Sequence, residues 1–270
     1  MRTAVCQLLA TRDVTANRER CVELVDRAGR AGADLVILPE AAMHPFGKPE
    51  ESLRPVAEPL DGPYVSALVQ AAGRSGSTVL AGMFAIVDGS ERVANTVVAV
   101  SGMGLLGSYR KVHLFDALGW RESQQLQAGE PEQLLTLPVG DQTVGVLTCY
   151  DLRFPEIARA LVNRGATMLA VPAAWVAGPL KEDHWATLLR ARAIENTCYV
   201  AAAGQAPRQF VGRSMVIDPM GVVLAGLAEQ DGAVAVADIS TDRLASVREQ
   251  LPSLTHRRYD VVPAGVLADR

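Results

Sequence analysis

The chain has 270 residues, and its 26 basic and 30 acidic residues give a formal net charge of −4 and a pI near 5.6. This balance provides no general basic field for a nucleic-acid backbone or an anionic membrane, so we expect neither as a partner. Hydrophobic residues make up 49% and charged residues 21%, which excludes a disordered chain and is ordinary for a folded enzyme.

The N-terminal segment and the cysteine content indicate a compartment. Residues 1–10 form a strand-like run around Gln7, without the apolar stretch and cleavage site of a signal peptide. No run approaches the roughly 18 apolar residues of a membrane span. Four cysteines without CxxC spacing favour neither a disulfide framework nor a zinc site. We therefore predict a cytoplasmic protein.

Apolar runs of strand length alternate with segments of helical period, which predicts an α/β protein built in layers. In the first helix Cys21, Leu24, Val25 and Ala28 share one face, and Gly29 and Gly32 are expected to end it. Pro63 begins the second helix, where a first residue tolerates proline. Further helices are expected over 155–165 and 184–196. Strands are expected over 34–38, 78–87, 94–100, 143–148, 167–171, 198–203, 213–217 and 233–239.

Two loops need interpretation. The Pro- and Gly-rich stretch 43–63 is long enough to predict a functional loop, and no segment resembles an interdomain linker, so we predict one domain over 1–270. Residues 102–107 have the G-x-G-x-x-G spacing of a dinucleotide site. Because the segment 108–112 continues as alternating strand instead of a helix, we interpret these glycines as a hairpin turn.

Cys149 differs from the other three cysteines in its position. Cys6, Cys21 and Cys198 lie within predicted strands or on an apolar helix face, where a free cysteine is commonly a small hydrophobe. Cys149 ends an apolar strand and precedes a turn into a helix, where backbone N–H groups can face an oxyanion. Cys149 is therefore the candidate nucleophile.

Glu40 and Lys111 are candidate partners of that thiol. Glu40 follows the end of the predicted strand over 34–38. The alternation over 109–115 turns Tyr109, Lys111 and His113 toward one face. Taken singly, each is more often a solvent-exposed charge. Together, a carboxylate can take the thiol proton, return it to a leaving amine and then activate water, while an ammonium stabilises the oxyanion.

Other catalytic arrangements lack support in the sequence. The four histidines, at 44, 113, 184 and 256, have no evident orienting partner, and His113 is only a minor candidate base for a Cys–His pair. The segment 212–216 lacks the final glycine of a GxSxG elbow. No helix carries paired histidines, so we predict no metal.

Three segments resemble the signatures of the nitrilase superfamily, the carbon–nitrogen hydrolases: 38–40 (LPE), 109–115 (YRKVHLF) and 149–156 (CYDLRFPE). The resemblance spans nearly the whole chain. It implies a four-layer α-β-β-α sandwich, no cofactor, a homodimer or higher homo-oligomer, and a triad of Glu40 as base, Lys111 as oxyanion stabiliser and Cys149 as nucleophile. It further implies that Glu122 supports Lys111, that the Tyr150 backbone completes the oxyanion hole, and that Ala174 and Trp175 line the substrate pocket.

Within this superfamily, 184–195 and the C-terminal tail are similar to the Nit-type amidases. This similarity implies a thioester-forming amidase that releases ammonia from a small amide, such as an α-keto acid amide of the deaminated glutathione type. A carboxylate-bearing substrate needs a cationic contact, for which Arg153, Lys48 and Arg110 are candidates. For Arg153 an ion pair at the turn or at a dimer interface is the alternative. An ω-amidase, a carbamoyl-amine hydrolase, a nitrilase and a catalytically silent binding subunit remain open.

Overall fold

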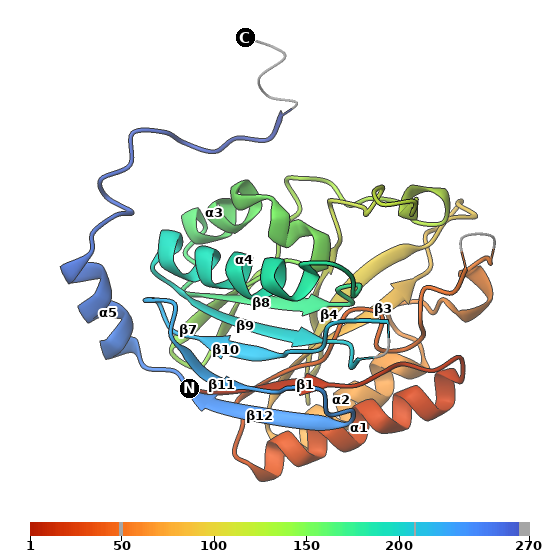
Figure 1. Ribbon diagram of the computed structural model, residues 1–270. Helices are drawn as coiled ribbons and strands as arrows, with labels where there is room; N and C mark the ends of the chain where they lie inside the picture. The colour runs from red at the N-terminus through yellow and green to blue at the C-terminus, as the bar shows by residue number, and fades with distance from the viewer. Residues whose placement is uncertain (49–50, 208, 265–270) are drawn as a thin grey trace.

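The computed structural model of the protein describes residues 1–48, 51–207 and 209–264, and in these residues two six-stranded sheets face each other (Figure 1). In spatial order the first sheet contains β12 (Ala233–Asp238), β1 (Arg2–Gln7), β2 (Leu35–Ile37), β3 (Thr78–Ala85), β4 (Ala94–Ser101) and β5 (Gly104–Arg110). The second contains β11 (Val223–Gly226), β10 (Met215–Ile217), β9 (Tyr199–Gly204), β8 (Met168–Ala173), β7 (Gln142–Val146) and β6 (Thr136–Val139).

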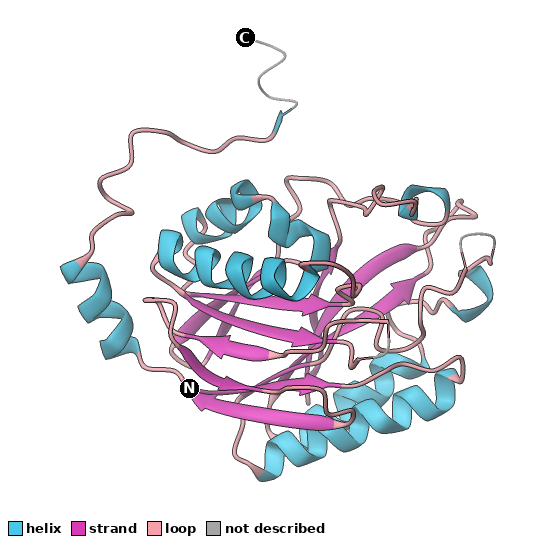
Figure 2. Cartoon of the chain, viewed as in Figure 1, coloured by secondary structure: helices cyan, strands magenta, loops and turns pink. Residues whose placement is uncertain are grey.

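Helices cover the outer face of each sheet. The described helices are α1 (Val14–Arg30), α2 (Pro63–Ser75), α3 (Pro155–Asn163), α4 (Lys181–Asn196) and α5 (Thr241–Gln250), with short 3-10 helices at Arg54–Val56, Glu122–Gln124 and Cys149–Arg153. Helices α1 and α2 pack on the first sheet, and α3 and α4 on the second (Figure 2). The predicted α-β-β-α sandwich is confirmed. Among the residues described, no helix is long and apolar enough to cross a membrane.

The apolar runs in the sequence arise because most strands are buried on both faces. In β1, Ala4 and Cys6 join the core under α1 and α2, whereas Val5 joins the core between the sheets. In β4, Val97 joins the core between the sheets and Val98 joins the core under the helices. Because side chains alternate across a strand, two apolar cores require an uninterrupted apolar sequence.

The first helix is longer than the glycines indicated. Asp13 caps α1 by accepting a hydrogen bond from Ala16 N–H at 3.0 Å, and the helix continues through Gly29 to Arg30. A Cβ on Gly29 would lie 2.4 Å from Ser75 Cβ, so this glycine permits the close approach of α1 and α2 instead of ending the helix. Gly32, with φ of +76°, follows the helix end.

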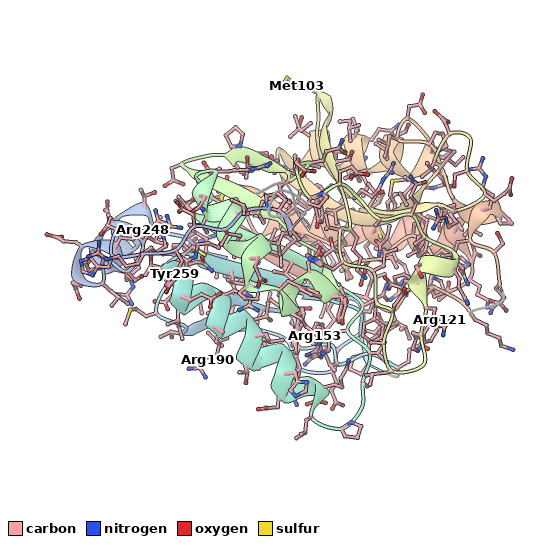
Figure 3. All side chains as sticks on the ribbon, turned by 90° about the horizontal axis from the view of Figure 1, so that it is seen from above. Met103, Arg121, Arg153, Arg190, Arg248 and Tyr259 are labelled. Atoms are coloured by element: carbon pink, nitrogen blue, oxygen red, sulfur yellow. The ribbon has the colours of Figure 1, made fainter. Side chains whose placement is uncertain are left out.

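The glycine-rich segment 102–107 lies at a hairpin, as predicted. β4 and β5 are antiparallel, and Met103 projects from the turn between them with 94% of its surface exposed (Figure 3). The predicted continuation of the strand through residue 115 is wrong, because β5 ends at Arg110 and an irregular segment follows. That segment bends toward Glu40 and Glu122, whose carboxylates bind Lys111.

Three elements had no clear pattern in the sequence. β6 is short and contains Pro138, β11 is largely exposed, and the buried residues of α5 are only Leu244 and Val247. β10 starts at Met215, two residues later than expected, because Arg213 adopts a φ of +51° that no strand residue has.

Strand direction brings the candidate residues to one edge. β1, β2 and β3 are mutually parallel, and two antiparallel steps give β5 the same direction. In the facing sheet β7, β8 and β9 are parallel, and a parallel bridge between Leu8 and Gln205 joins the two sheets just past β1 and β9. The carboxyl ends of strands from both sheets therefore meet, as ligand sites in open α/β sheets require.

Candidate active site

Glu40 lies past the end of β2 with its side chain fully buried. Its Oε1 accepts hydrogen bonds from Lys111 Nζ at 2.9 Å and Asn95 Nδ2 at 2.7 Å, and its Oε2 accepts one from Ala174 N–H at 2.7 Å. These donors come from both sheets. A carboxylate with three donors is held in one orientation, which proton transfer at a defined atom requires.

Lys111 is 1% exposed and lies between two carboxylates. Besides Glu40, its Nζ donates to both oxygens of Glu122, at 2.9 and 3.1 Å. Burial by itself lowers the pKa of Lys111, but Glu122 and Glu40 outweigh burial and raise it well above its ordinary value. The site therefore holds a permanent ammonium.

Glu122 opens the 3-10 helix Glu122–Gln124 and also accepts a hydrogen bond from Phe115 N–H at 2.9 Å. Burial raises the pKa of this carboxyl group, Lys111 opposes that effect, and Glu40 adds to it. Glu122 thus ties the irregular segment after β5 to the lysine.

Cys149 follows β7 and is the first residue of the 3-10 helix Cys149–Arg153. Its φ of +48° is unusual for a residue with a side chain and marks a sharp turn from strand to helix. Burial raises the pKa of the thiol well above its ordinary value, and Glu40 adds to this, whereas Lys111 lowers it. Tyr150 is the second residue of the turn, where backbone N–H groups have no intrahelical acceptor.

Asp151 holds this turn in place. Its Oδ2 accepts hydrogen bonds from Tyr109 Oη at 2.7 Å and Thr148 N–H at 2.9 Å, and its Oδ1 accepts one from His113 N–H at 3.0 Å. The His113 ring also contacts Oδ1 through Nδ1 at 2.7 Å. Asp151 is fully buried, so these contacts anchor the cysteine turn to the segment that carries Lys111.

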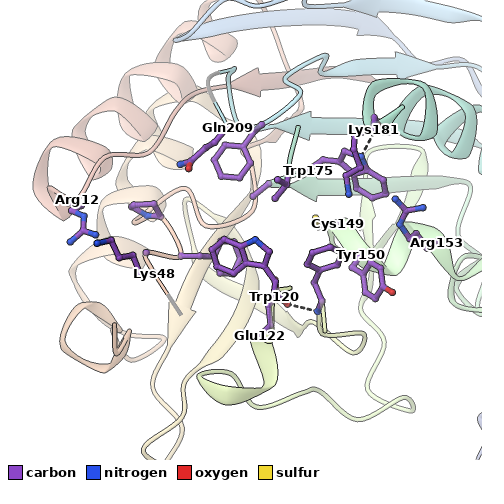
Figure 4. A pocket seen from close by; sticks show the side chains of 17 residues that line it. Arg12, Lys48, Trp120, Glu122, Cys149, Tyr150, Arg153, Trp175, Lys181 and Gln209 are labelled. Atoms are coloured by element: carbon purple, nitrogen blue, oxygen red, sulfur yellow. Dashed lines mark hydrogen bonds between the residues drawn. The ribbon is translucent and has the colours of Figure 1, made fainter. Parts of the chain in front are cut away.

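A cavity of about 340 Å³ opens above the cysteine (Figure 4). Of the predicted site residues, Glu122, Cys149, Tyr150, Arg153, Ala174 and Trp175 line it. Lys48 lines it as well, with an exposed side chain, whereas Arg110 does not reach it. Trp175 is 3% exposed, so this side chain belongs to the core and to the cavity wall at once.

The alternatives raised by the sequence find no geometric support. His113 binds Asp151 and stacks on Phe154 with ring centroids 3.8 Å apart, away from the cavity lining. Cys6, Cys21 and Cys198 are fully buried, and burial raises the pKa of Cys21 and of Cys198 to about 12. In the part of the chain that the structure describes, no three His, Cys, Asp or Glu side chains gather as a metal site requires.

Sequence reasoning missed several supporting residues. Asn95 orients Glu40 from β4, and Gln205 Nε2 donates to the carbonyl oxygens of Glu40 and Ala41 at 3.0 and 3.1 Å. Lys181, the first residue of α4, also lines the cavity. The signal in the sequence that could have identified Asn95 is a polar residue inside an otherwise apolar strand.

A thiol beside a carboxylate, an ammonium and a cavity, at the meeting edge of two sheets, defines a cysteine-dependent hydrolase. The chain belongs to the carbon–nitrogen hydrolase family, whose sequence model matches residues 2–249. It is accordingly an enzyme that hydrolyses amides.

Similarity to individual proteins extends over nearly the full length. The chain is 38% identical to the deaminated glutathione amidase of Escherichia coli O157:H7, covering 96% of this chain and 98% of the relative. It is 40% identical to the deaminated glutathione amidase of Synechocystis sp. strain PCC 6803, covering 95% and 97%. Its fold is similar to the crystal structure of XC1258 from Xanthomonas campestris, a CN-hydrolase superfamily protein, with a TM-score of 0.87, 29% identity and coverage of 97% and 99%.

Proposed function

We propose that the protein hydrolyses a small carboxylate-bearing amide of the deaminated glutathione type, with Cys149 as nucleophile, Glu40 as general base and Lys111 as oxyanion stabiliser. The observation that carries the proposal is the buried Lys111 ammonium, which bridges Glu40 and Glu122 beside a thiol that lines the cavity. Burying three charged groups is costly even when they are paired, and such clusters are typical of functional sites.

Acylation begins with the thiol protonated, since its pKa is raised. Cys149 Sγ attacks the carbonyl carbon of the amide while the Glu40 carboxylate takes the thiol proton. The carbonyl π electrons move to oxygen, and the resulting oxyanion is stabilised by Lys111 Nζ and the Tyr150 N–H. Glu122 keeps Lys111 in place through its two hydrogen bonds.

Collapse of the tetrahedral intermediate breaks the carbon–nitrogen bond. The protonated Glu40 transfers its proton to the departing nitrogen, which leaves as a neutral amine, and a thioester remains on Cys149. Glu40 then takes a proton from water as the water oxygen attacks the thioester. The carbon–sulfur bond then breaks, and Glu40 returns the proton to the leaving Cys149 sulfur, which regenerates the thiol. The overall reaction converts an amide and water into a carboxylic acid and an amine.

The amine identifies the substrate class. A primary amide, such as α-ketoglutaramate, releases ammonia. The γ-amide nitrogen of deaminated glutathione belongs to cysteinylglycine, so that substrate releases the dipeptide instead. The ammonia release expected from the sequence is therefore wrong for this substrate and holds only for primary amides. The relatives named as deaminated glutathione amidases support the second class.

The test incubates the purified protein with deaminated glutathione and, separately, with α-ketoglutaramate. We expect cysteinylglycine release from the first, and its loss by at least 10³-fold in Cys149→Ala, because the nucleophile is the group that forms the intermediate. The exposed Glu19→Gln variant of α1 serves as a matched control. Equal turnover in Cys149→Ala contradicts the assignment of the nucleophile; ammonia from α-ketoglutaramate alone moves the substrate to the primary amides. A homodimer remains a prediction, which sedimentation of the purified protein tests.

A further inference from the structure

Lys181 places an uncompensated cation at the cavity. The sequence has three lysines: Lys111 belongs to the buried ion cluster, and Lys48 and Lys181 line the cavity. Lys181 is 8% exposed, yet its Nζ has no hydrogen bond or ion pair within the described residues. It lies over two aromatic rings, 5.1 Å from the centroid of Trp175 and 5.3 Å from that of Phe115. Aromatic rings attract the positive charge, but unlike a carboxylate they do not provide oxygen acceptors for the three N–H groups.

Arg153 faces the same tryptophan. Its guanidinium carbon lies 4.7 Å from the centroid of Trp175, and its polar contact is with His184 Nδ1 at 3.5 Å. Among the described residues Arg153 has no ion pair with a carboxylate, so they give no support to the alternative of an ion pair at the turn. The two cations approach Trp175 from different elements, the 3-10 helix Cys149–Arg153 and the start of α4 (Figure 4).

The described acidic residues nearby bind other partners. Glu122, the one carboxylate among the described residues that line the cavity, is bound to Lys111 and Phe115 N–H. Glu182, next to Lys181, pairs with Arg213 at 2.8 Å. The pKa of Lys181 is lowered by burial and by Arg153, which agrees with two cations that lack an anion. Two cations without a carboxylate partner among the described residues thus lie together at the Trp175 side of the cavity.

We infer that Lys181 and Arg153 form a carboxylate-binding subsite, in which Lys181 selects amides that carry a carboxylate over neutral amides of the same size. The inference rests on the proposed function and deepens it. A carboxylate between the two cations supplies acceptors to both and is held over the Trp175 ring. The same contacts place the amide carbonyl at a set distance from Cys149, which favours turnover of an acidic substrate.

The test separates binding from chemistry. Cys149→Ala protein is titrated by calorimetry with succinamate and with butyramide, which differ in one carboxylate. The titrations are then repeated with Lys181→Met, Lys181→Arg and Arg30→Met added. Methionine keeps the apolar stem over the rings. Arg30→Met is the matched control, because it also removes one positive charge, at an exposed residue at the end of α1. Thermal unfolding of each variant checks that it is folded, and Lys181→Gln replaces Lys181→Met if that variant does not fold.

We expect the parent to prefer succinamate. Lys181→Met is expected to weaken succinamate binding at least tenfold, which equals about 1.4 kcal/mol, and to change butyramide binding less than twofold. Lys181→Arg and Arg30→Met should retain the preference. No preference in the parent, or equal losses for both amides in Lys181→Met, overturns the subsite.

Turnover by the protein with Cys149 intact distinguishes the two proposals. Cys149-dependent amide hydrolysis without any effect of Lys181→Met on the KM for succinamate refutes the subsite alone. Selective succinamate binding without amine release from any amide refutes the proposed function and leaves the subsite standing.

Discussion

Glu122 accepts two hydrogen bonds from Lys111 while it competes with Glu40 for the same ammonium. At the scale of single residues, this arrangement affects the pH at which Glu122 takes up a proton. Burial raises the pKa of Glu122 above its ordinary value of 4.5, Lys111 opposes this, and Glu40 adds to it. As pH falls, Glu122 therefore takes up a proton earlier than an exposed glutamate does, and Lys111 loses one of its two anions.

A pH profile of kcat/KM tests this assignment. We expect the acid limb of the unmodified protein to lie above pH 4.5, the ordinary pKa of a glutamate. In Glu122→Gln that titration is absent, so the limb should move to lower pH, with a maximum lowered roughly tenfold because Lys111 loses a charged hydrogen-bond partner worth about 1.5–3 kcal/mol. Glu19→Gln should leave the profile unchanged. An acid limb at the same pH in Glu122→Gln would assign it to another group.

Residue type alone does not indicate the roles of Lys181, Asn95 and Asp151 in the site. Each is an ordinary polar residue in the sequence, and the contacts that give it a role come from segments distant along the chain. Asn95 meets Glu40 across 55 residues, and Asp151 meets Tyr109 across 42. Such contacts depend on the register of two sheets, which no local pattern records.

At the scale of elements, the turn after β2 determines where Glu40 lies. Ala41 has a φ of +54°, and Gln205 binds the carbonyl oxygens of Glu40 and Ala41. β3 passes directly beneath the turn: a Cβ on Gly82 would lie 2.6 Å from Glu40 Cα, Ala41 N and Pro39 O. Only glycine allows this approach, because all three neighbours are backbone atoms.

Gly82→Ala should therefore displace the turn. We expect a loss of unfolding free energy of about 1–3 kcal/mol, typical of overpacking, together with a decrease in kcat/KM as Glu40 leaves its position. Denaturant unfolding and steady-state kinetics measure the two effects. Gly73→Ala in α2 is the control, since its Cβ would lie 3.4 Å from Gly102 Cα in ordinary contact and alanine favours a helix. Unchanged stability and kinetics in Gly82→Ala would contradict the close approach.

At the scale of the whole molecule, the two sheets share one core. Val5 and Leu80 of the first sheet belong to the same buried cluster as Val146 and Leu169 of the second. Neither sheet can bury its inner face without the other, and the site depends on both, since Glu40 binds Lys111 from one sheet and Ala174 N–H from the other. We propose on this basis that the chain unfolds as one domain.

Calorimetry tests that proposal. We expect a single transition in which the calorimetric and van't Hoff enthalpies agree. Leu80→Ala removes buried surface from the shared core and should lower stability by about 2–5 kcal/mol. It should shift the far-ultraviolet and near-ultraviolet melting midpoints together. Two separable transitions, or a shift confined to one signal, would show two independent units.

The sequence by itself determined the α/β class, most strands and helices, and the identity of Glu40, Lys111 and Cys149 as candidates. Periodicity is a local property, and Glu40 and Cys149 stand at the ends of apolar strands, where position in the chain already indicates chemistry. The segment 109–115 shows the limit: its alternation predicted a longer strand, whereas β5 ends at Arg110 and Lys111 turns toward its carboxylates.

Only the tertiary structure decided which charges are compensated. Lys111 pairs with two carboxylates and Lys181 with none among the described residues, although both lysines are buried. That difference depends on which strand ends and helix starts meet when two sheets pack face to face. Because the free energy of a buried charge is set by neighbours within a few ångströms, not by neighbours in sequence, it became visible only in the folded chain.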